Sequence, residues 1–180
     1  NGNELAKTYL NIGNTYAKNG FAEQAIPHYI KAQKLFQEQK DDFHTAVALN
    51  NLGNAYSELN QIDKAKEQYL HSIELKKTLD NQLGLATSLN NLGDFYYDKD
   101  DFKNAQRYFE QSLAIVNQIK ADDLKALVLR NLSYTAEVQH DYLRAFDYYY
   151  QYDTLNTKLT EQNFTILLCT CCYIRSIIRT

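Results

Sequence analysis

One eight-residue pattern returns every forty residues along the chain, and this periodicity constrains the fold more than any other feature. It reads Leu-Asn-Asn-Leu-Gly-Asn-Ala-Tyr at 49–56 and Leu-Asn-Asn-Leu-Gly-Asp-Phe-Tyr at 89–96. A related stretch lies at 9–16, and a degraded copy with Ser in place of Gly lies at 129–136. A period of about 20 to 50 residues is typical of repeat arrays, so we expect a solenoid of four similar units.

The composition favours helices in each unit. The 180 residues include one Pro and six Gly, too few turn-forming residues for a sandwich or barrel of short strands. Hydrophobic residues make up 44% and charged residues 23% of the chain, as in a globular protein. The net charge of −3 supplies no basic surface. We therefore expect neither nucleic acid as a direct partner nor membrane insertion by the repeats.

Apolar and small residues recur in each unit at spacings of three and four, which places them on one face of a helix. In the second unit the first such stripe is formed by Ala46, Leu49, Leu52, Gly53 and Tyr56. After a polar break, a second stripe is formed by Ala65, Tyr69 and Ser72. Each unit is thus predicted to contain two antiparallel helices. The expected helices are 4–18, 22–38, 43–59, 62–78, 83–99, 102–118, 122–138 and 142–158.

A glycine recurs inside the first helix of three units, although Gly in a helix costs about 1 kcal/mol relative to Ala. These glycines are Gly13, Gly53 and Gly93. We expect them to let the two helices of a unit approach closely, with an aromatic residue of the second helix filling the space beside them. The expected core aromatic residues are Tyr29, Tyr69, Phe109 and Tyr149.

This combination of columns resembles the tetratricopeptide repeat (TPR). In the first unit the residues that match the family pattern are Tyr9, Ile12, Gly13, Tyr16, Ala25, Tyr29 and Ala32. The resemblance covers residues 4–158, and the fourth unit departs from it at Ser133, Ala136 and Tyr152. It implies an all-α, right-handed superhelical solenoid of four antiparallel helix pairs plus a C-terminal segment. The repeats would span about 4–40, 43–80, 83–120 and 122–160 within an array of residues 1–160.

The period of forty residues exceeds the family's usual period of about 34. The Pro that commonly ends a repeat is also missing, since Gln37, Lys77 and Asn117 stand in its place. We expect longer helices and a longer connection between repeats. This variety is similar to that of bacterial TPR regulators and sensor proteins. The resemblance implies a non-catalytic scaffold that binds a protein or an extended peptide within a larger signalling or regulatory protein.

Two other functions stay open. The repeats could control an attached histidine kinase, phosphatase or DNA-binding domain, or they could form an oligomerisation array through the convex face, making a homo-oligomer. The chain has no Met, and its start, 1–6, resembles the linker 81–86. We therefore expect a piece of a longer protein with further repeats before it. A cytoplasmic location is favoured, and a periplasmic sensor region is the alternative.

A polar face of the first helices is the candidate binding surface, because in the TPR family this face lines the concave groove. An amide offers both a donor and an acceptor, as a peptide backbone requires. The recurring Asn residues could instead hydrogen-bond neighbouring repeats, or only keep the groove solvated. The candidate binding residues are Asn11, Asn14, Asn50, Asn51, Asn54, Asn90, Asn91, Asp94, Arg130 and Asn131.

No residue set predicts catalysis, a metal site or a cofactor. The four histidines occupy different columns and have no Cys or His at metal-ligand spacing. The glycines are isolated, so no phosphate-binding loop is formed. The acidic pairs at 41–42, 100–101 and 122–123 fall between helices, where capping explains them better than acid–base chemistry.

The tail at 161–180 differs from the repeats. Its segment 164–174 is apolar and contains the three cysteines, Cys169, Cys171 and Cys172. These eleven residues are too few to cross a bilayer, which needs about 20. Three interpretations stay open: a cap over the last repeat, a non-native end, or an approach to a membrane or acylation site.

Overall fold

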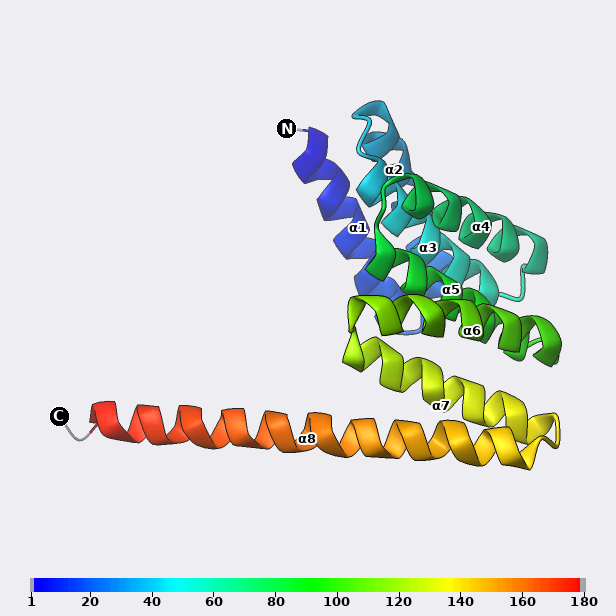
Figure 1. Ribbon diagram of the computed structural model, residues 1–180. Helices are drawn as coiled ribbons and strands as arrows, with labels where there is room; N and C mark the ends of the chain where they lie inside the picture. The colour runs from blue at the N-terminus through cyan, green and yellow to red at the C-terminus, as the bar shows by residue number, and fades with distance from the viewer. Residues whose placement is uncertain (1, 179–180) are drawn as a thin grey trace.

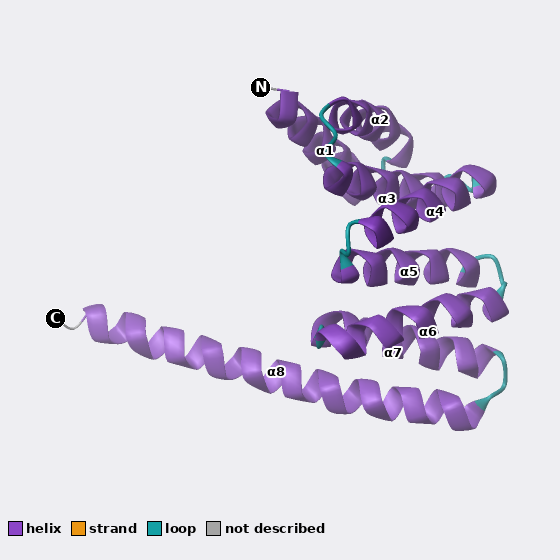
Figure 2. Ribbon diagram, turned by 45° about the horizontal axis from the view of Figure 1, so that its top comes forward, coloured by secondary structure: helices purple, strands orange, loops and turns teal. Residues whose placement is uncertain are grey.

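The computed structural model describes the backbone of residues 2–178 and the side chains of residues 2–161. Eight antiparallel helices follow one another in a ladder, and residues 2–178 contain no strand (Figures 1 and 2). They are α1 (Gly2–Lys18), α2 (Ala22–Glu38), α3 (Asp42–Glu58), α4 (Ile62–Thr78), α5 (Gln82–Tyr97), α6 (Phe102–Ile119), α7 (Asp122–Val138) and α8 (Tyr142–Ile178). The expected all-α solenoid of helix pairs is confirmed, and only α8 departs from its predicted bounds by more than two residues.

The turns between helices repeat every 20 residues, which is half the sequence period. Each turn contains one residue in the left-handed backbone region, namely Gly20, Lys40, Asn60, Asp80, Asp100, Lys120 and His140. Connections within a repeat and between repeats are equally short, as 19–21 and 39–41 show. The expected longer connection between repeats is wrong, because the extra residues lengthen the helices.

Backbone hydrogen bonds close these turns without relying on glycine. After Lys40, the Asp41 N–H donates to the Phe36 carbonyl at 2.9 Å, and after Asn60, the Gln61 N–H donates to the Tyr56 carbonyl at 2.9 Å. This Schellman-type closure satisfies carbonyls that a helix end would otherwise leave unpaired. Because the closure uses backbone atoms, the sequence shows few of the usual turn residues.

The glycines of the first helices lie directly against aromatic rings of the second helices. A Cβ built on Gly53 would lie 2.7 Å from Cδ1 of Tyr69, and one on Gly93 would lie 2.5 Å from Cε1 of Phe109. Atoms cannot approach so closely without a shift of the ring. The predicted close approach within each of the first three repeats is therefore confirmed.

The fourth repeat packs differently. Ser133 replaces the glycine and donates its hydroxyl to the Ala145 carbonyl at 2.9 Å. Tyr149 is 51% exposed, whereas Tyr29 is 2% exposed. The prediction of a buried Tyr149 is wrong, because its counterparts are enclosed by the first helix of the next repeat: Tyr29, for example, lies in one buried cluster with Ala48, Leu52 and Ala55 of α3. No helix follows α8 within residues 2–178.

Helix α8 continues to Ile178 instead of ending near 158, and its C-terminal part extends beyond the start of α7 (Figures 1 and 2). The side chains of 162–180, including the three cysteines, lie outside the described residues. The three interpretations of the tail therefore stay predictions. In the part of the chain whose side chains are described, no helix is long and apolar enough to cross a membrane.

The first helices form the inner layer of the solenoid. α1 contacts α3, α3 contacts α5, and α5 contacts α7, whereas the second helices α2, α4 and α6 make no such contact with one another in the described structure. Helices that touch across repeats lie on the inside of the curvature, and helices that splay apart lie on the outside. The face shared by α1, α3, α5 and α7 is thus the concave face.

Candidate functional site

Amide side chains connect successive repeats along the concave face. Asn51 Nδ2 donates to Asn14 Oδ1 at 2.9 Å, and Asn91 Nδ2 donates to Asn50 Oδ1 at 3.3 Å. In the next repeat, Asn131 Nδ2 donates to Asn90 Oδ1 at 3.2 Å and to Asp94 Oδ1 at 2.8 Å. We call this series the amide ladder. It gives the recurring Asn a structural role, which is one of the alternatives that the sequence leaves open.

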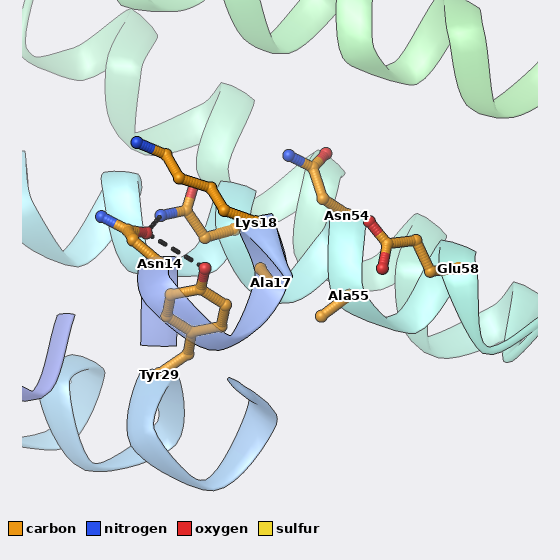
Figure 3. A pocket seen from close by; sticks show the side chains of 8 residues that line it. Asn14, Ala17, Lys18, Tyr29, Asn54, Ala55 and Glu58 are labelled. Carbon is orange, nitrogen blue, oxygen red and sulfur yellow. Dashed lines mark hydrogen bonds between the residues drawn. The ribbon is translucent and has the colours of Figure 1, made fainter. Parts of the chain in front are cut away.

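A second set of bonds ties the ladder to the core aromatic residues. The Tyr29 hydroxyl donates to Asn14 Oδ1 at 3.0 Å (Figure 3), and the Tyr69 hydroxyl donates to Asn54 Oδ1 at 2.7 Å. In the third repeat the aromatic residue is Phe109, which has no hydroxyl, and the amide is replaced by Asp94. The Asp94 carboxylate instead accepts from the Asn90 and Asn131 amides.

The ladder divides the ten predicted binding residues by accessibility. Asn50 and Asn90 are 7% and 1% exposed, so they mainly support the repeats and leave little surface for a partner. Asn11 is exposed and no described repeat precedes it, so it stands apart from the others. The remaining residues are partly exposed along the seams between first helices: Asn14, Asn51, Asn54, Asn91, Asp94, Arg130 and Asn131.

Three hollows follow these seams. The first, about 290 Å³, lies between α1 and α3 and includes Asn14, Lys18, Tyr29, Asn51 and Glu58 (Figure 3). The second, about 270 Å³, lies between α3 and α5 and includes Asn54, Glu58, Asn91, Asp94 and Asp98. The third, about 350 Å³, lies further along the same α3–α5 seam and includes Asn50, Asn51, Lys76, Asn81 and Gly84. Shared lining residues make the three hollows a continuous series.

The second hollow is negatively charged. Burial, together with repulsion from Asp98, raises the pKa of Asp94 to about 7, and the charge of Arg130 opposes this rise. The exposed carboxylates of Glu58 and Asp98 line the same hollow. The Nε atom of Arg130 is buried without a hydrogen-bond partner among the described residues. This hollow can therefore accept a cationic group.

Sequence reasoning missed several residues of the site. Glu58 and Asp98 lie one turn after the Asn54–Asp94 column, so helical spacing could have found them. Lys76 occupies the position of Phe36 in the first repeat and Val116 in the third, and is 4% exposed. A lysine in an otherwise apolar column was the available signal.

The described residues show no metal centre, since no three His, Cys, Asp or Glu side chains among them are grouped to hold an ion. His44 is instead paired with Asp41 at 2.7 Å and stacked on Phe36 with ring centroids 4.9 Å apart. The concave face thus offers hydrogen-bonding and charged groups for binding.

A comparison with known protein families agrees with this architecture. The family model described as tetratricopeptide repeat matches residues 4–78 and 84–152. The chain belongs to the tetratricopeptide repeat family. A search of curated proteins finds no match.

Several solved structures share this TPR fold. BtubC from P. vanneervenii is 23% identical with a TM-score of 0.79, over 89% of this chain and 66% of BtubC. Aspartyl phosphate phosphatase F from Bacillus subtilis is 11% identical with a TM-score of 0.86, over 89% of this chain and 42% of its own. A Rap protein complexed with competence and sporulation factor is 14% identical with a TM-score of 0.84, over 90% and 45%. The chain thus spans less than two thirds of each of these proteins.

Proposed function

We propose that the concave face of this TPR array binds an extended peptide or a segment of a partner protein, without catalysing a reaction. The observation that supports the proposal most directly is the series of hollows of about 290, 270 and 350 Å³ along the first helices. A similarly folded Rap protein is complexed with competence and sporulation factor. A TPR array is generally a scaffold for protein interaction, which agrees with this proposal.

The amide ladder leaves polar atoms available for such a partner. The bonds between repeats use Nδ2 of Asn51 and Asn91, whose Oδ1 atoms make no hydrogen bond with the described residues. Asn54 accepts through Oδ1 and keeps its Nδ2 as a donor. A peptide unit presents one N–H and one C=O, so these atoms provide the acceptor and the donor that it needs.

Charge adds specificity to this surface. Glu58, Asp94 and Asp98 gather around the second hollow, and a Lys or Arg side chain of the partner would relieve their mutual repulsion. We therefore propose a partner segment with a basic residue at this position. Charged rims mainly affect association rate and specificity, so binding should weaken with salt.

The test uses a displayed peptide library selected on the wild-type chain, with binders measured by calorimetry. Reversing the groove charges with Glu58→Lys and Asp98→Lys should weaken binding at least about tenfold. The matched control reverses Glu67 and Glu74, which are exposed on α4. Binders that respond to the α4 pair and ignore the groove pair would contradict the proposal.

We further propose that the array belongs to a larger regulatory protein and controls a domain outside this chain. The chain spans 66%, 42% and 45% of BtubC, phosphatase F and the Rap protein. Attaching the natural flanking sequence and measuring its activity with and without a selected peptide would test this. An activity that never responds to the peptide would contradict regulation while leaving the binding proposal intact.

A second candidate function is assembly through α8. Leu143, Phe146 and Tyr150 are 82%, 68% and 63% exposed on one outward face. The equivalent residues of α6 are polar, namely Lys103, Gln106 and Glu110. An exposed apolar face of this kind is typical of a protein contact, and we propose a second copy of the chain as the partner. Sedimentation of the wild type and of Phe146→Lys would show whether assembly occurs and depends on this face.

A further inference from the structure

The α4–α5 junction contains a lysine that is buried without a counter-ion. Lys76 is 4% exposed, and its Nζ donates to Ser88 Oγ at 2.6 Å. No carboxylate among the described residues forms an ion pair with it. Burial lowers the pKa of Lys76 to about 8, so the side chain remains mainly protonated at neutral pH. A buried ammonium group with one hydrogen bond is unfavourable unless another group completes its environment.

The equivalent junction between α2 and α3 shows which side chains fill this space when the lysine and the glycine are absent. There Phe36 stands in place of Lys76 and His44 in place of Gly84. The two rings stack with centroids 4.9 Å apart and fill the space. At α4–α5 a flexible lysine and a glycine replace both rings, and a hollow of about 350 Å³ remains. Apolar side chains also occupy both positions at α6–α7, namely Val116 and Leu124.

This hollow, which we call the Lys76 pocket, has walls of two kinds. Phe43, Val47 and Leu83 form an apolar side, and Asn50, Asn51 and Asn81 supply amides. Asn81 Oδ1 accepts from the Gly84 N–H at 3.0 Å, which leaves its Nδ2 as a donor. The apolar walls lower the local dielectric constant and so strengthen any charge pair that forms between them.

Hydrogen bonds connect the lysine to the concave face. Ser88 Oγ, which accepts from Lys76, donates to Asn50 Oδ1 at 2.8 Å. Asn50 Oδ1 also accepts from Asn91 Nδ2 of the amide ladder. Asn51 lines both this pocket and the hollow between α1 and α3. The buried cation therefore lies at the base of the same surface to which we assign peptide binding.

We propose that the Lys76 pocket receives a carboxylate of the bound peptide. This inference rests on the proposed function and defines one chemical feature of the partner. The carboxylate would pair with the Lys76 ammonium and accept from the Asn81 amide. Either an Asp or Glu side chain or the C-terminus of the peptide could supply it, because both present the same two oxygens.

The second hollow, called the acidic hollow here because Glu58, Asp94 and Asp98 line it, extends the proposal to a pattern of charges in the partner. On α3, Asn50 lines the Lys76 pocket and Ser57 lines the acidic hollow, seven residues apart. This separation corresponds to about 10 Å along a helix at about 1.5 Å per residue. An extended peptide covers that distance in about three residues. The partner segment should therefore carry a carboxylate and a basic side chain a few residues apart.

Nuclear magnetic resonance titration of Lys76 tests the pocket directly, with three short peptides as probes. Acetyl-Ala-Glu-Ala amide offers a side-chain carboxylate, acetyl-Ala-Gln-Ala acid offers a terminal carboxylate, and acetyl-Ala-Gln-Ala amide offers neither. A bound carboxylate favours the charged lysine, so saturation should raise the pKa of Lys76 by at least about one unit. The probe that produces this rise identifies the source, and the neutral peptide should produce none.

Two variants separate the pocket from general charge effects. Lys76→Val introduces the residue of the equivalent position in α6 and should abolish the shifts at the Gly84 amide. Lys77→Gln removes the adjacent exposed lysine and should leave them unchanged. If Lys76→Val unfolds, the wild-type titration with the charged and neutral probes still decides the question. The proposal is overturned if neither acid probe moves Lys76 or Gly84, or if the neutral probe moves them equally.

The same variants distinguish carboxylate binding in the Lys76 pocket from peptide binding along the groove. Selected peptides that lose affinity with Glu58→Lys and Asp98→Lys, but bind normally to Lys76→Val, would reject the Lys76 pocket and keep the proposed function. Shifts with the short acid probes, combined with selected peptides that ignore every groove variant, would keep the pocket as a carboxylate site and reject peptide binding along the groove.

Discussion

The α2–α3 and α4–α5 junctions occupy equivalent places in consecutive repeats but have opposite chemistry. The first is filled by Phe36, which is fully buried, and by the His44 ring stacked on it. The second contains buried Lys76, hydrogen-bonded to Ser88, beside a hollow of about 350 Å³. The flanking helices nevertheless have nearly equal lengths, with 17 residues in α2, α3 and α4 and 16 in α5.

This difference shows which contacts define the fold and which are free to vary. Each repeat contacts only its neighbours, so stability is close to a sum of local interfaces. The glycine–ring contacts inside the repeats are the same on both sides of the comparison, since Gly13 meets Tyr29 and Gly53 meets Tyr69. A polar junction can therefore lie between well-packed neighbours without changing the path of the backbone.

Transferring the polar chemistry into the filled junction should have the largest effect. Phe36→Lys removes a fully buried ring and introduces an unpaired charge, so we expect a loss of about 4–5 kcal/mol in the free energy of unfolding. Urea denaturation followed by circular dichroism measures it. A loss below about 1 kcal/mol would show that the α2–α3 junction tolerates polar groups as α4–α5 does.

The glycine–ring contact, which both repeats share, should be the next most sensitive to substitution. Gly53→Leu places a side chain where even a Cβ would lie 2.7 Å from the Tyr69 ring, so we expect a loss of about 3 kcal/mol in the free energy of unfolding. Gly20→Ala is the control, since a Cβ there meets nothing within 4 Å and only the left-handed backbone opposes it. Equal losses in the two variants would contradict the assigned packing.

Converting the polar junction into the filled one should stabilise the protein. Lys76→Phe replaces a buried charge by a ring, and we expect a gain of about 1–2 kcal/mol near neutral pH. The folded-state pKa of Lys76, about 8, lies below the unfolded value of 10.5, so folding favours the neutral form. The wild type should regain stability as the pH rises from about 8 to 10.5, and the advantage of Lys76→Phe should shrink over that range. A pH-independent gain would exclude charge burial as the cause.

The smallest predicted effect on stability concerns Asp94, which belongs to the amide ladder and follows the polar α4–α5 junction in sequence. Asp94→Asn restores the residue type of Asn14 and Asn54 and removes a carboxyl whose pKa is raised from 3.8 to about 7 by burial and by Asp98. Because the folded state holds that proton more tightly, the wild type should lose stability as the pH rises from about 4 to 7. We expect Asp94→Asn to gain about 1 kcal/mol at pH 8 and nothing near pH 4.

Chemical denaturation of wild type and Asp94→Asn across this pH range measures the difference. Asp98→Asn is the matched control, because it removes the neighbouring repulsion while keeping the buried carboxyl. It should give a smaller gain. Identical dependence of stability on pH in wild type and Asp94→Asn would show that folding does not raise the pKa of Asp94.

The sequence alone determined the solenoid, because a forty-residue period combined with helical spacing has few other solutions. Seven of the eight helices begin and end within two residues of the prediction for the same reason. The close approach at Gly53 also followed from the sequence, since a glycine that recurs inside a helix needs a packing explanation. These features depend on spacing within one or two helices.

How the repeats meet depends on tertiary packing. The amide ladder joins residues 37 to 41 positions apart in sequence, such as Asn51 and Asn14. No local sequence pattern specifies which two side chains form each hydrogen bond. The exposure of Tyr149 depends on whether another helix covers it. The Lys76 pocket depends on two residues from different helices, Lys76 and Gly84, being small or flexible at one place. Junction chemistry is set by such pairings across repeats, and they exist only once the helices are packed.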